Sequence, residues 1–161
     1  MTIQVGDTLP EAHFRTMTSD GPVEVGNDFF SGKTVALFAV PGAFTPTCSA
    51  RHLPGYVERA NELKAHGIDV IACTAVNDIF VLDAWAKANG ANDITMLADG
   101  TGAFAESIGL GMDGAKFGMG LRSRRYAMLV KDGIIEQLHV EAPGEFDVSS
   151  AEHLLSGLSS N

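Results

Sequence analysis

The sequence has few of the residues that mark secreted, membrane-bound or nucleic-acid-binding proteins. It contains 2 cysteines in 161 residues, too few for a secreted disulfide framework. No apolar run approaches the roughly 20 residues that span a bilayer, and the first residues form neither the basic nor the apolar part of a signal peptide. Basic residues are outnumbered 11 to 20, and the net charge of −9 repels phosphate backbones and anionic lipids. We therefore expect a cytoplasmic protein without nucleic-acid or membrane partners.

The chain also lacks features that would divide it into parts. It contains no internal repeat, low-complexity tract or linker-like stretch. Its composition, 45% hydrophobic and 19% charged, is ordinary for a globular protein. The 5 histidines are scattered, with no pair at a metal-ligand spacing. We expect one domain over residues 1–161, with no bound metal.

The first half of the chain shows alternating strand and helix patterns. Residues 34–40 (TVALFAV) form a β-branched and aromatic run, which is typical of a strand buried on both faces. Apolar residues at helical spacing from Thr47 to Leu63 then predict a helix of about five turns. Pro54 cannot donate to the carbonyl of Ala50, so we expect a bend there.

The pattern continues with a second strand and helix. Residues 68–75 predict another buried strand, and Asn77-Asp78 predicts the cap of a helix that runs to Asn89-Gly90. Residues 126–131 and 134–141 predict two antiparallel strands, because Asp132-Gly133 between them is a strong hairpin signal.

A last helix is predicted at the C-terminal end. Ser149-Ser150-Ala151-Glu152 matches a capping box, with Ser149 as the capping residue of the helix. The resulting order of elements, βαβ followed by ββα, is that of the thioredoxin fold. We expect an α/β protein with a central mixed β-sheet flanked by helices.

Cys48 follows a segment of distinctive composition. Residues 41–48 (PGAFTPTC) link the first buried strand to the helix and place Cys48 in the first helical turn. The free N–H groups and the positive end of the helix dipole favour a thiolate there, and the thiolate is the nucleophilic form. Pro41 and Pro46 fix the backbone on either side, and the Thr45 hydroxyl can exchange hydrogen bonds with an O–O–H group. These features predict a reactive cysteine rather than a structural one.

The same stretch resembles a known family. The sequence P-G-A-F-T-P-T-C-S (41–49) is similar to the active-site signature of the peroxiredoxins, in the form used by their type II and atypical members. The motifs V-N-D-I-F-V (76–81) and R-S-R-R-Y (122–126) extend the resemblance over nearly the whole chain. It implies a thiol-dependent peroxidase that reduces hydrogen peroxide and alkyl hydroperoxides without a bound cofactor. It also suggests a homodimer joined near the active-site end.

The resemblance implies roles for individual residues. Cys48 corresponds to the peroxidatic cysteine, Thr45 to the hydroxyl that orients the peroxide, and Pro41 to the shield against water. The family's arginine precedes the aromatic residue of the last motif, which selects Arg125. A permanent guanidinium beside a thiolate lowers the thiol pKa and donates hydrogen bonds to the peroxide oxygens.

The neighbouring arginines are assigned a different role. If Arg124 and Arg125 both lie on a strand, their side chains point to opposite faces. We therefore interpret Arg122 and Arg124 as a solvated basic patch.

Two further patterns receive weaker interpretations. Residues 109–114 spell G-x-G-x-x-G, but no strand pattern precedes them and no helical pattern follows, so we expect no dinucleotide site. We expect a flexible loop over residues 109–120, with Phe117 and Met119 as contacts near the site or across a dimer. His52 lies four residues after Cys48 on the same helix face, which places it where it can support the site from behind.

The route by which Cys48 is recycled stays open. Atypical relatives place a resolving cysteine near the last helix, but this chain has Ser149 and Ser150 there. We therefore expect recycling by glutathione and glutaredoxin. The alternative is a thioredoxin-recycled peroxidase with a Cys48–Cys73 disulfide, although Cys73 ends an apolar run where a thiol behaves as a small hydrophobe.

Two other functions compete with the peroxidase. A redox sensor or chaperone-like protein would use the same first step, so only turnover with a reductant separates it from an enzyme. A binding module without chemistry would not need Pro41, Thr45, Cys48 and Arg125 together.

Overall fold

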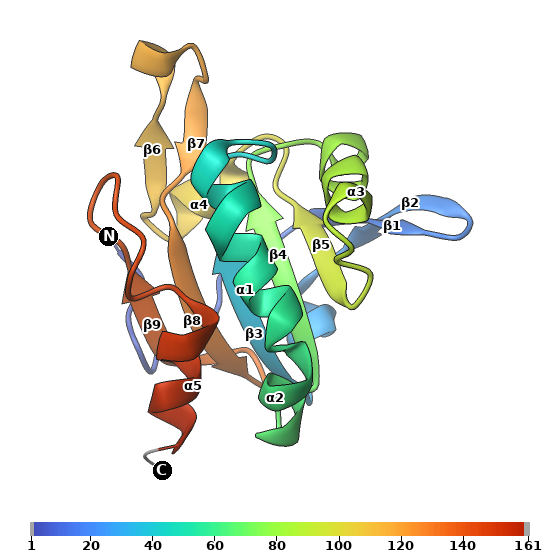
Figure 1. Cartoon of the computed structure of the whole chain (residues 1–161), viewed down its shortest axis with the longest axis vertical. Coiled ribbons are helices and arrows are strands. Elements are labelled where there is room, and N and C mark those ends of the chain that lie inside the picture. The colour runs from blue at the N-terminus through green and yellow to red at the C-terminus, as the bar shows by residue number, and fades with distance from the viewer. Residues whose placement is uncertain (1, 160–161) are drawn as a thin grey trace.

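A seven-stranded mixed sheet forms the centre of the computed structural model (Figure 1). The structure describes the backbone of residues 2–159 and the side chains in this range except those of Cys48, Ser49 and Ser159. The sheet has the order β2-β1-β5-β4-β3-β8-β9. Its strands are β1 (Phe14–Thr18), β2 (Gly21–Val25), β3 (Thr34–Ala39), β4 (Val70–Ala75), β5 (Ile94–Ala98), β8 (Tyr126–Lys131) and β9 (Ile134–Val140).

Alternation along the central strands builds two apolar cores. Neighbouring strands β3, β4 and β5 are parallel, while β8 runs antiparallel to β3. Ala36 and Phe38 of β3 face one core, and Val35 and Leu37 face the other. Both faces are buried, which explains why β3 reads as a continuous apolar run.

Helices cover both faces of the sheet. The first core packs against α1 (Leu53–Glu58), α2 (Ala60–Ala65), α3 (Ile79–Ala88) and α5 (Ala151–Ser159). Figure 1 shows α1, α2 and α5 in front of the sheet. The second core packs against α4 (Ala103–Ser107), the 3₁₀ helix η1 (Asn27–Phe30) and the N-terminal residues. The predicted α/β architecture with a mixed sheet and flanking helices is confirmed. Within residues 2–159, the structure contains no helix with the length and apolar character needed to cross a membrane.

The helix that follows β3 differs from the prediction of one bent helix. A π-helical segment, η2 (Cys48–His52), comes first and is followed by α1. The helical conformation is then interrupted at Arg59, and α2 begins after it. Pro54 lies in the first turn of α1, where no N–H is needed, and the wider π turn precedes it. The bend expected at Pro54 is therefore replaced by a change of helical pitch before it and a break after α1.

Two local predictions are confirmed in detail. The Asp78 carboxylate accepts a hydrogen bond from the Val81 amide at 2.9 Å and caps α3. Asp132 and Gly133 adopt φ values of 50° and 79°, which suits the tight turn between β8 and β9. Strand β5, for which no pattern is assigned from the sequence, lies between β4 and β1 in the sheet.

The capping residue of α5 is Ser150, so the assignment of Ser149 is wrong. The His153 amide donates to the Ser150 hydroxyl at 3.1 Å. The Ser149 hydroxyl is buried and donates instead to the Glu141 carboxylate at 2.6 Å. Either serine fits the capping pattern, and only the buried carboxylate decides between them.

Residues 109–120 are more ordered than the predicted loop. They contain β6 (Gly111–Asp113) and the 3₁₀ helix η3 (Ala115–Phe117), and β6 pairs with β7 (Leu121–Ser123) in a separate two-stranded sheet. Arg122 holds this hairpin, because it donates to the carbonyls of Met119 at 2.9 Å and Val76 at 3.1 Å. Its assignment to a solvated patch is therefore wrong.

Candidate active site

The segment from β3 to η2 forms a tight turn before Cys48. The Thr45 hydroxyl donates to the Gly42 carbonyl at 2.6 Å, and Phe44 between them adopts a φ of 65°. The Ala43 amide is held by the Asn77 side chain at 3.0 Å. Because the Thr45 hydrogen is engaged with Gly42, its oxygen is left to accept a hydrogen bond from a molecule that reaches the turn.

The backbone of Cys48 begins η2, in agreement with the first helical turn predicted from the sequence. Its side chain lies outside the described residues. Thr47, the residue before it, and Pro41, at the start of the turn, line the cavity described below.

Arg125 is held by a buried histidine. An Nη1 hydrogen of Arg125 points to His52 Nδ1 at 2.8 Å, and His52 Nε2 lies 3.0 Å from the Ser149 carbonyl. A guanidinium can only donate and a carbonyl can only accept, so Nδ1 is the acceptor and Nε2 carries the proton. His52, for which the helix spacing allows a supporting position, is thus hydrogen-bonded to Arg125.

The surroundings of His52 keep it uncharged. The side chain has no exposed surface, and its ring lies against those of Phe38, Tyr56 and Phe146 at centroid distances of 4.9, 5.6 and 5.0 Å. Burial, together with the charge of Arg125, lowers the pKa of His52 to about 3. A neutral His52 accepts the bond from Arg125 at any pH near neutrality.

The buried Glu141 fixes the loop that supplies the Ser149 carbonyl. Its Oε2 accepts from the amides of Asp147 at 2.6 Å and Ser149 at 2.8 Å, in addition to the Ser149 hydroxyl. Burial alone would raise the pKa of Glu141, but these hydrogen bonds outweigh it and hold the pKa below its ordinary value. An ionised Glu141 thus orders residues 141–149.

A cavity of about 590 Å³ opens at this place. It lies between the turn before Cys48, the β6–β7 hairpin and the loop that follows β9. Its walls comprise Pro41, Thr47, Gly111, Met112, Phe117, Met119, Arg124, Arg125, Glu141, Ala142, Pro143, Gly144 and Glu145. The lining is therefore mostly apolar, with two arginines and two glutamates among its residues. Phe117 and Met119, expected near the site or across a dimer, both line this cavity.

Arg124 departs from its predicted position. Both Arg124 and Arg125 lie between β7 and β8, outside either strand, so strand alternation does not separate them. Both line the cavity, and Arg124 also donates to the Glu141 carbonyl at 3.0 Å. Its interpretation as part of a solvated patch is wrong. Met112 and Glu141 were missed because a short irregular strand and an isolated glutamate give no sequence signal.

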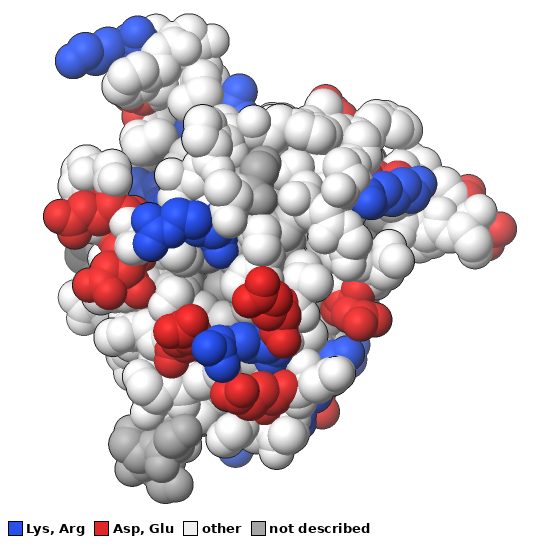
Figure 2. Space-filling view, viewed as in Figure 1, with Lys and Arg blue, Asp and Glu red and all other residues white. Residues whose placement is uncertain are grey.

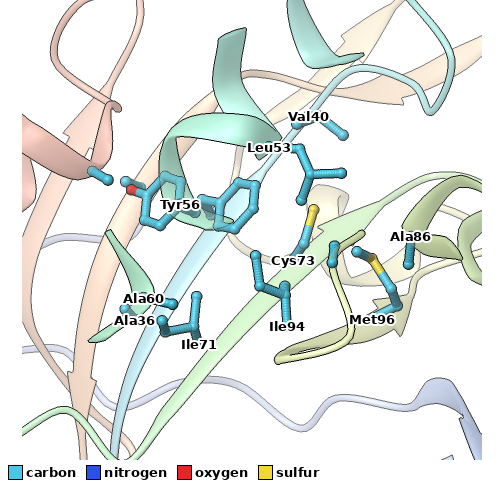
Figure 3. Close-up of a cluster of buried hydrophobic side chains, with 14 of the residues drawn as sticks. Ala36, Val40, Leu53, Tyr56, Ala60, Ile71, Cys73, Ala86, Ile94 and Met96 are labelled. Carbon is cyan, nitrogen blue, oxygen red and sulfur yellow. The ribbon is translucent and has the colours of Figure 1, made fainter. Parts of the chain in front are cut away.

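Cys73 lies in the sheet beneath α1. It has no exposed surface, and Figure 3 shows its sulfur directed toward Leu53, with Ile94 and Met96 nearby. Phe38 of β3 is its register partner and stacks on Tyr56 at 4.0 Å. Among the side chains that the structure describes, no three His, Cys, Asp or Glu residues gather in a way that could hold a metal ion.

Comparison with known proteins agrees with this geometry. A family model described as Redoxin matches residues 4–155. The chloroplastic peroxiredoxin-2E of Arabidopsis thaliana is 47% identical over 163 residues, covering 98% of this chain and 70% of the relative. The chain belongs to the peroxiredoxin family. Peroxiredoxin-2B of the same plant is 43% identical over 159 residues, covering 97% of this peroxiredoxin and 98% of the relative.

A solved structure supports the same assignment. Reduced Prx3 from Vibrio vulnificus, crystallised in complex with H2O2, matches this peroxiredoxin with a TM-score of 0.95 and 51% identity. The match covers 98% of this chain and 99% of the other. The protein is a thiol-dependent peroxidase with a thioredoxin-like fold, whose substrates are a peroxide and a reducing thiol.

The burial of His52 predicts a pH-dependent stability. Its pKa of about 3 lies below the value of about 6.5 expected for an unfolded chain, so the unfolded state binds more protons between these values. Stability should therefore fall as the pH drops below about 6.5, by up to about 1.4 kcal/mol per pH unit from this group. Urea unfolding of wild type and His52→Gln at pH 6.5, 6.0, 5.5 and 5.0 should show a smaller slope in the variant.

His13 provides a control of opposite sign. It is exposed, and its hydrogen bond to Glu24 raises its pKa. His13→Gln should leave the slope unchanged or make it slightly steeper. Equal slopes in wild type and His52→Gln would show that His52 titrates alike in the folded and unfolded states.

Proposed function

We propose that Cys48 is the peroxidatic nucleophile of a single catalytic domain spanning residues 1–161. The observation that carries the proposal is the cavity. Arg125 lines it together with Pro41 and Thr47, the residues that flank the Cys48 turn. A cation and a nucleophile held at one opening are what the reduction of a hydroperoxide requires.

The first step is an attack of the Cys48 thiolate on the terminal oxygen of the hydroperoxide. A sulfur–oxygen bond forms while the O–O bond breaks, and the electron pair of that bond leaves with the alkoxide. The alkoxide takes a proton to become an alcohol, or water when the substrate is hydrogen peroxide. The cysteine is left as the sulfenic acid.

Three residues assist this step. Arg125 stabilises the thiolate and the negative charge that grows on the peroxide oxygens. Thr45 accepts the hydrogen bond of the O–O–H group, since its own hydrogen is engaged with Gly42. Pro41 lines the cavity without an N–H donor and keeps water from the thiolate. His52 acts through Arg125, whose guanidinium it orients.

The sulfenic acid is then recycled by glutathione with glutaredoxin, in a reducing compartment such as the cytoplasm. One thiol displaces water to give a mixed disulfide with Cys48, and a second thiol releases the enzyme as a free thiol. The burial of Cys73 beneath Leu53 supports this external route, because an internal disulfide needs Cα atoms within roughly 7 Å and an accessible sulfur. Cys73 is accordingly a core residue rather than the resolving cysteine.

The enzyme functions as a homodimer joined at the end of the sheet that carries the site. Phe44 and Phe80 are 56% and 65% exposed, and Leu121 is 36% exposed. The hydrogen bond from the Ala43 amide to the Asn77 side chain holds the segment of Phe44 next to the segment of Phe80. Exposed large apolar side chains on adjoining segments favour an interface.

Replacing the proposed nucleophile should abolish the activity. A serine hydroxyl is too weak an acid to supply the attacking anion. Cys48→Ser should show no reduction of hydrogen peroxide above background in an assay with excess dithiothreitol, while its circular dichroism spectrum stays unchanged. Turnover within ten-fold of wild type in this folded variant would remove Cys48 from the mechanism.

Replacing Cys73 should leave most of the activity. If Cys73 only fills the core, Cys73→Ser should retain at least about half of the turnover with glutathione and glutaredoxin, with a lower melting temperature from the buried hydroxyl. Non-reducing peptide mapping of the oxidised wild type should show no Cys48–Cys73 disulfide. Loss of nearly all turnover in a folded variant, together with that disulfide in the wild type, would identify Cys73 as the resolving cysteine.

A charge placed on the proposed interface should separate the subunits. Phe80→Asp would bury a carboxylate in the dimer, which costs far more than the apolar contact it replaces. Sedimentation at about ten micromolar should give a dimer for the wild type and a monomer for Phe80→Asp. Ile134→Asp is the matched control, because Ile134 is 46% exposed but lies at the β8–β9 turn. An Ile134→Asp monomer, or a monomeric wild type, would rule out this interface.

A further inference from the structure

Arg124 is a cation at the cavity that the proposed reaction does not use. It is half-buried, and its bond to the Glu141 carbonyl directs the guanidinium toward the loop of residues 141–145. This bond uses one of the five N–H donors of the group. Arg124 thus presents a positive charge on the same cavity as Arg125.

The remaining walls of the cavity are largely apolar. Met112, Phe117 and Met119 come from the β6–β7 hairpin, and Ala142 and Pro143 come from the loop after β9. Figure 1 shows the hairpin projecting beyond the end of the main sheet, which leaves this wall at the molecular edge. Flexible methionine side chains adapt to apolar chains of differing shape. The cavity therefore offers an apolar surface bounded by a guanidinium.

Nearby acidic groups limit what the guanidinium can bind. The Glu141 carboxylate is already occupied by the amides and the hydroxyl of the loop, and Glu145 is exposed at the rim. The net charge of −9 repels anions at long range. An anion is therefore favoured here only when an apolar part brings it into the cavity beside Arg124.

We propose that Arg124 binds the carboxylate of a fatty-acid hydroperoxide while the apolar walls hold its chain. This inference rests on the proposed function, because the hydroperoxide group must reach Cys48 for the chain to matter. The reaction is unchanged: the thiolate takes the terminal oxygen, the O–O bond breaks, and the hydroxy fatty acid leaves after the alkoxide gains a proton. Arg124 is thus a specificity-determining residue that distinguishes acidic from neutral organic hydroperoxides.

A matched pair of substrates tests this role. The 9-hydroperoxide of linoleic acid and its methyl ester share the chain and the reacting group but differ in the carboxylate. The ratio of their kcat/KM values is measured below the micellar concentrations, with dithiothreitol as the common reductant. Arg124→Gln should lower the acid-to-ester ratio about five-fold, the size expected for a partly screened ion pair. Arg124→Lys should restore part of the ratio, because it returns the charge without the planar donors.

The control is Arg59→Gln, which removes the same charge elsewhere. Arg59 pairs with Glu62 and Glu152 on the surface of α1, α2 and α5, where acidic and basic groups lie side by side in Figure 2. This variant should keep the wild-type ratio. If Arg59→Gln and Arg124→Gln lower the acid-to-ester ratio equally, the effect comes from net charge alone and the proposal is overturned.

Other outcomes also overturn it, and each is distinguishable from failure of the peroxidase itself. If Arg124→Gln lowers kcat/KM equally for the acid and for the ester, Arg124 only supports the loop through its hydrogen bond to Glu141. If the variant changes the KM for glutathione but not the acid-to-ester ratio, the guanidinium serves the reductant. Hydrogen peroxide reduction by the wild type is the independent test of the proposed function, and its absence would remove both proposals together.

Discussion

The arrangement of the site depends on one buried, neutral imidazole. His52 accepts from Arg125 and donates to the Ser149 carbonyl, so a single ring joins three parts of the chain: η2, the segment before β8 and the segment before α5. Its burial lowers its pKa far below neutrality, and the neutral ring keeps an acceptor for the guanidinium. A protonated His52 would repel Arg125 and lose that hydrogen bond. Burial of His52 therefore fixes the orientation of the Arg125 guanidinium, because it keeps the imidazole neutral.

That imidazole has its own support in the packing around it. Tyr56 donates to the same Ser149 carbonyl at 2.9 Å and stacks on Phe38 of the central strand. On the other side, Glu141 holds the Ser149 amide and hydroxyl. The side chains of His52, Tyr56, Ser149 and Glu141 each have a hydrogen-bond partner, as burial requires. The sheet thus supports Arg125 through Phe38, Tyr56 and His52.

The cavity combines a fixed wall with an adaptable one. The Cys48 turn and Arg125 are tied to the sheet and its helices, whereas the wall formed by β6, η3 and β7 is a two-stranded hairpin outside the main sheet. Arg122 anchors this hairpin through backbone carbonyls on either side. An end with Arg125 and an apolar end with Met112 and Met119 suit an enzyme whose substrates share a peroxide group but differ in the rest of the molecule.

The sequence alone determined what short-range physics decides. The continuous run of β3, the Asp78 cap and the Asp132-Gly133 turn each follow from a few neighbouring residues, and the turn before Cys48 carries a motif readable without a structure. Only the tertiary structure decided where long-range contacts compete. Either Ser149 or Ser150 could cap α5 by the sequence pattern, but the Ser149 hydroxyl is hydrogen-bonded to Glu141 and Ser150 forms the cap. The positions of Arg124 and Arg125 likewise become clear only because both lie outside a strand. Such choices are set by residues distant in sequence, because a buried polar group takes the partner that the fold brings to it.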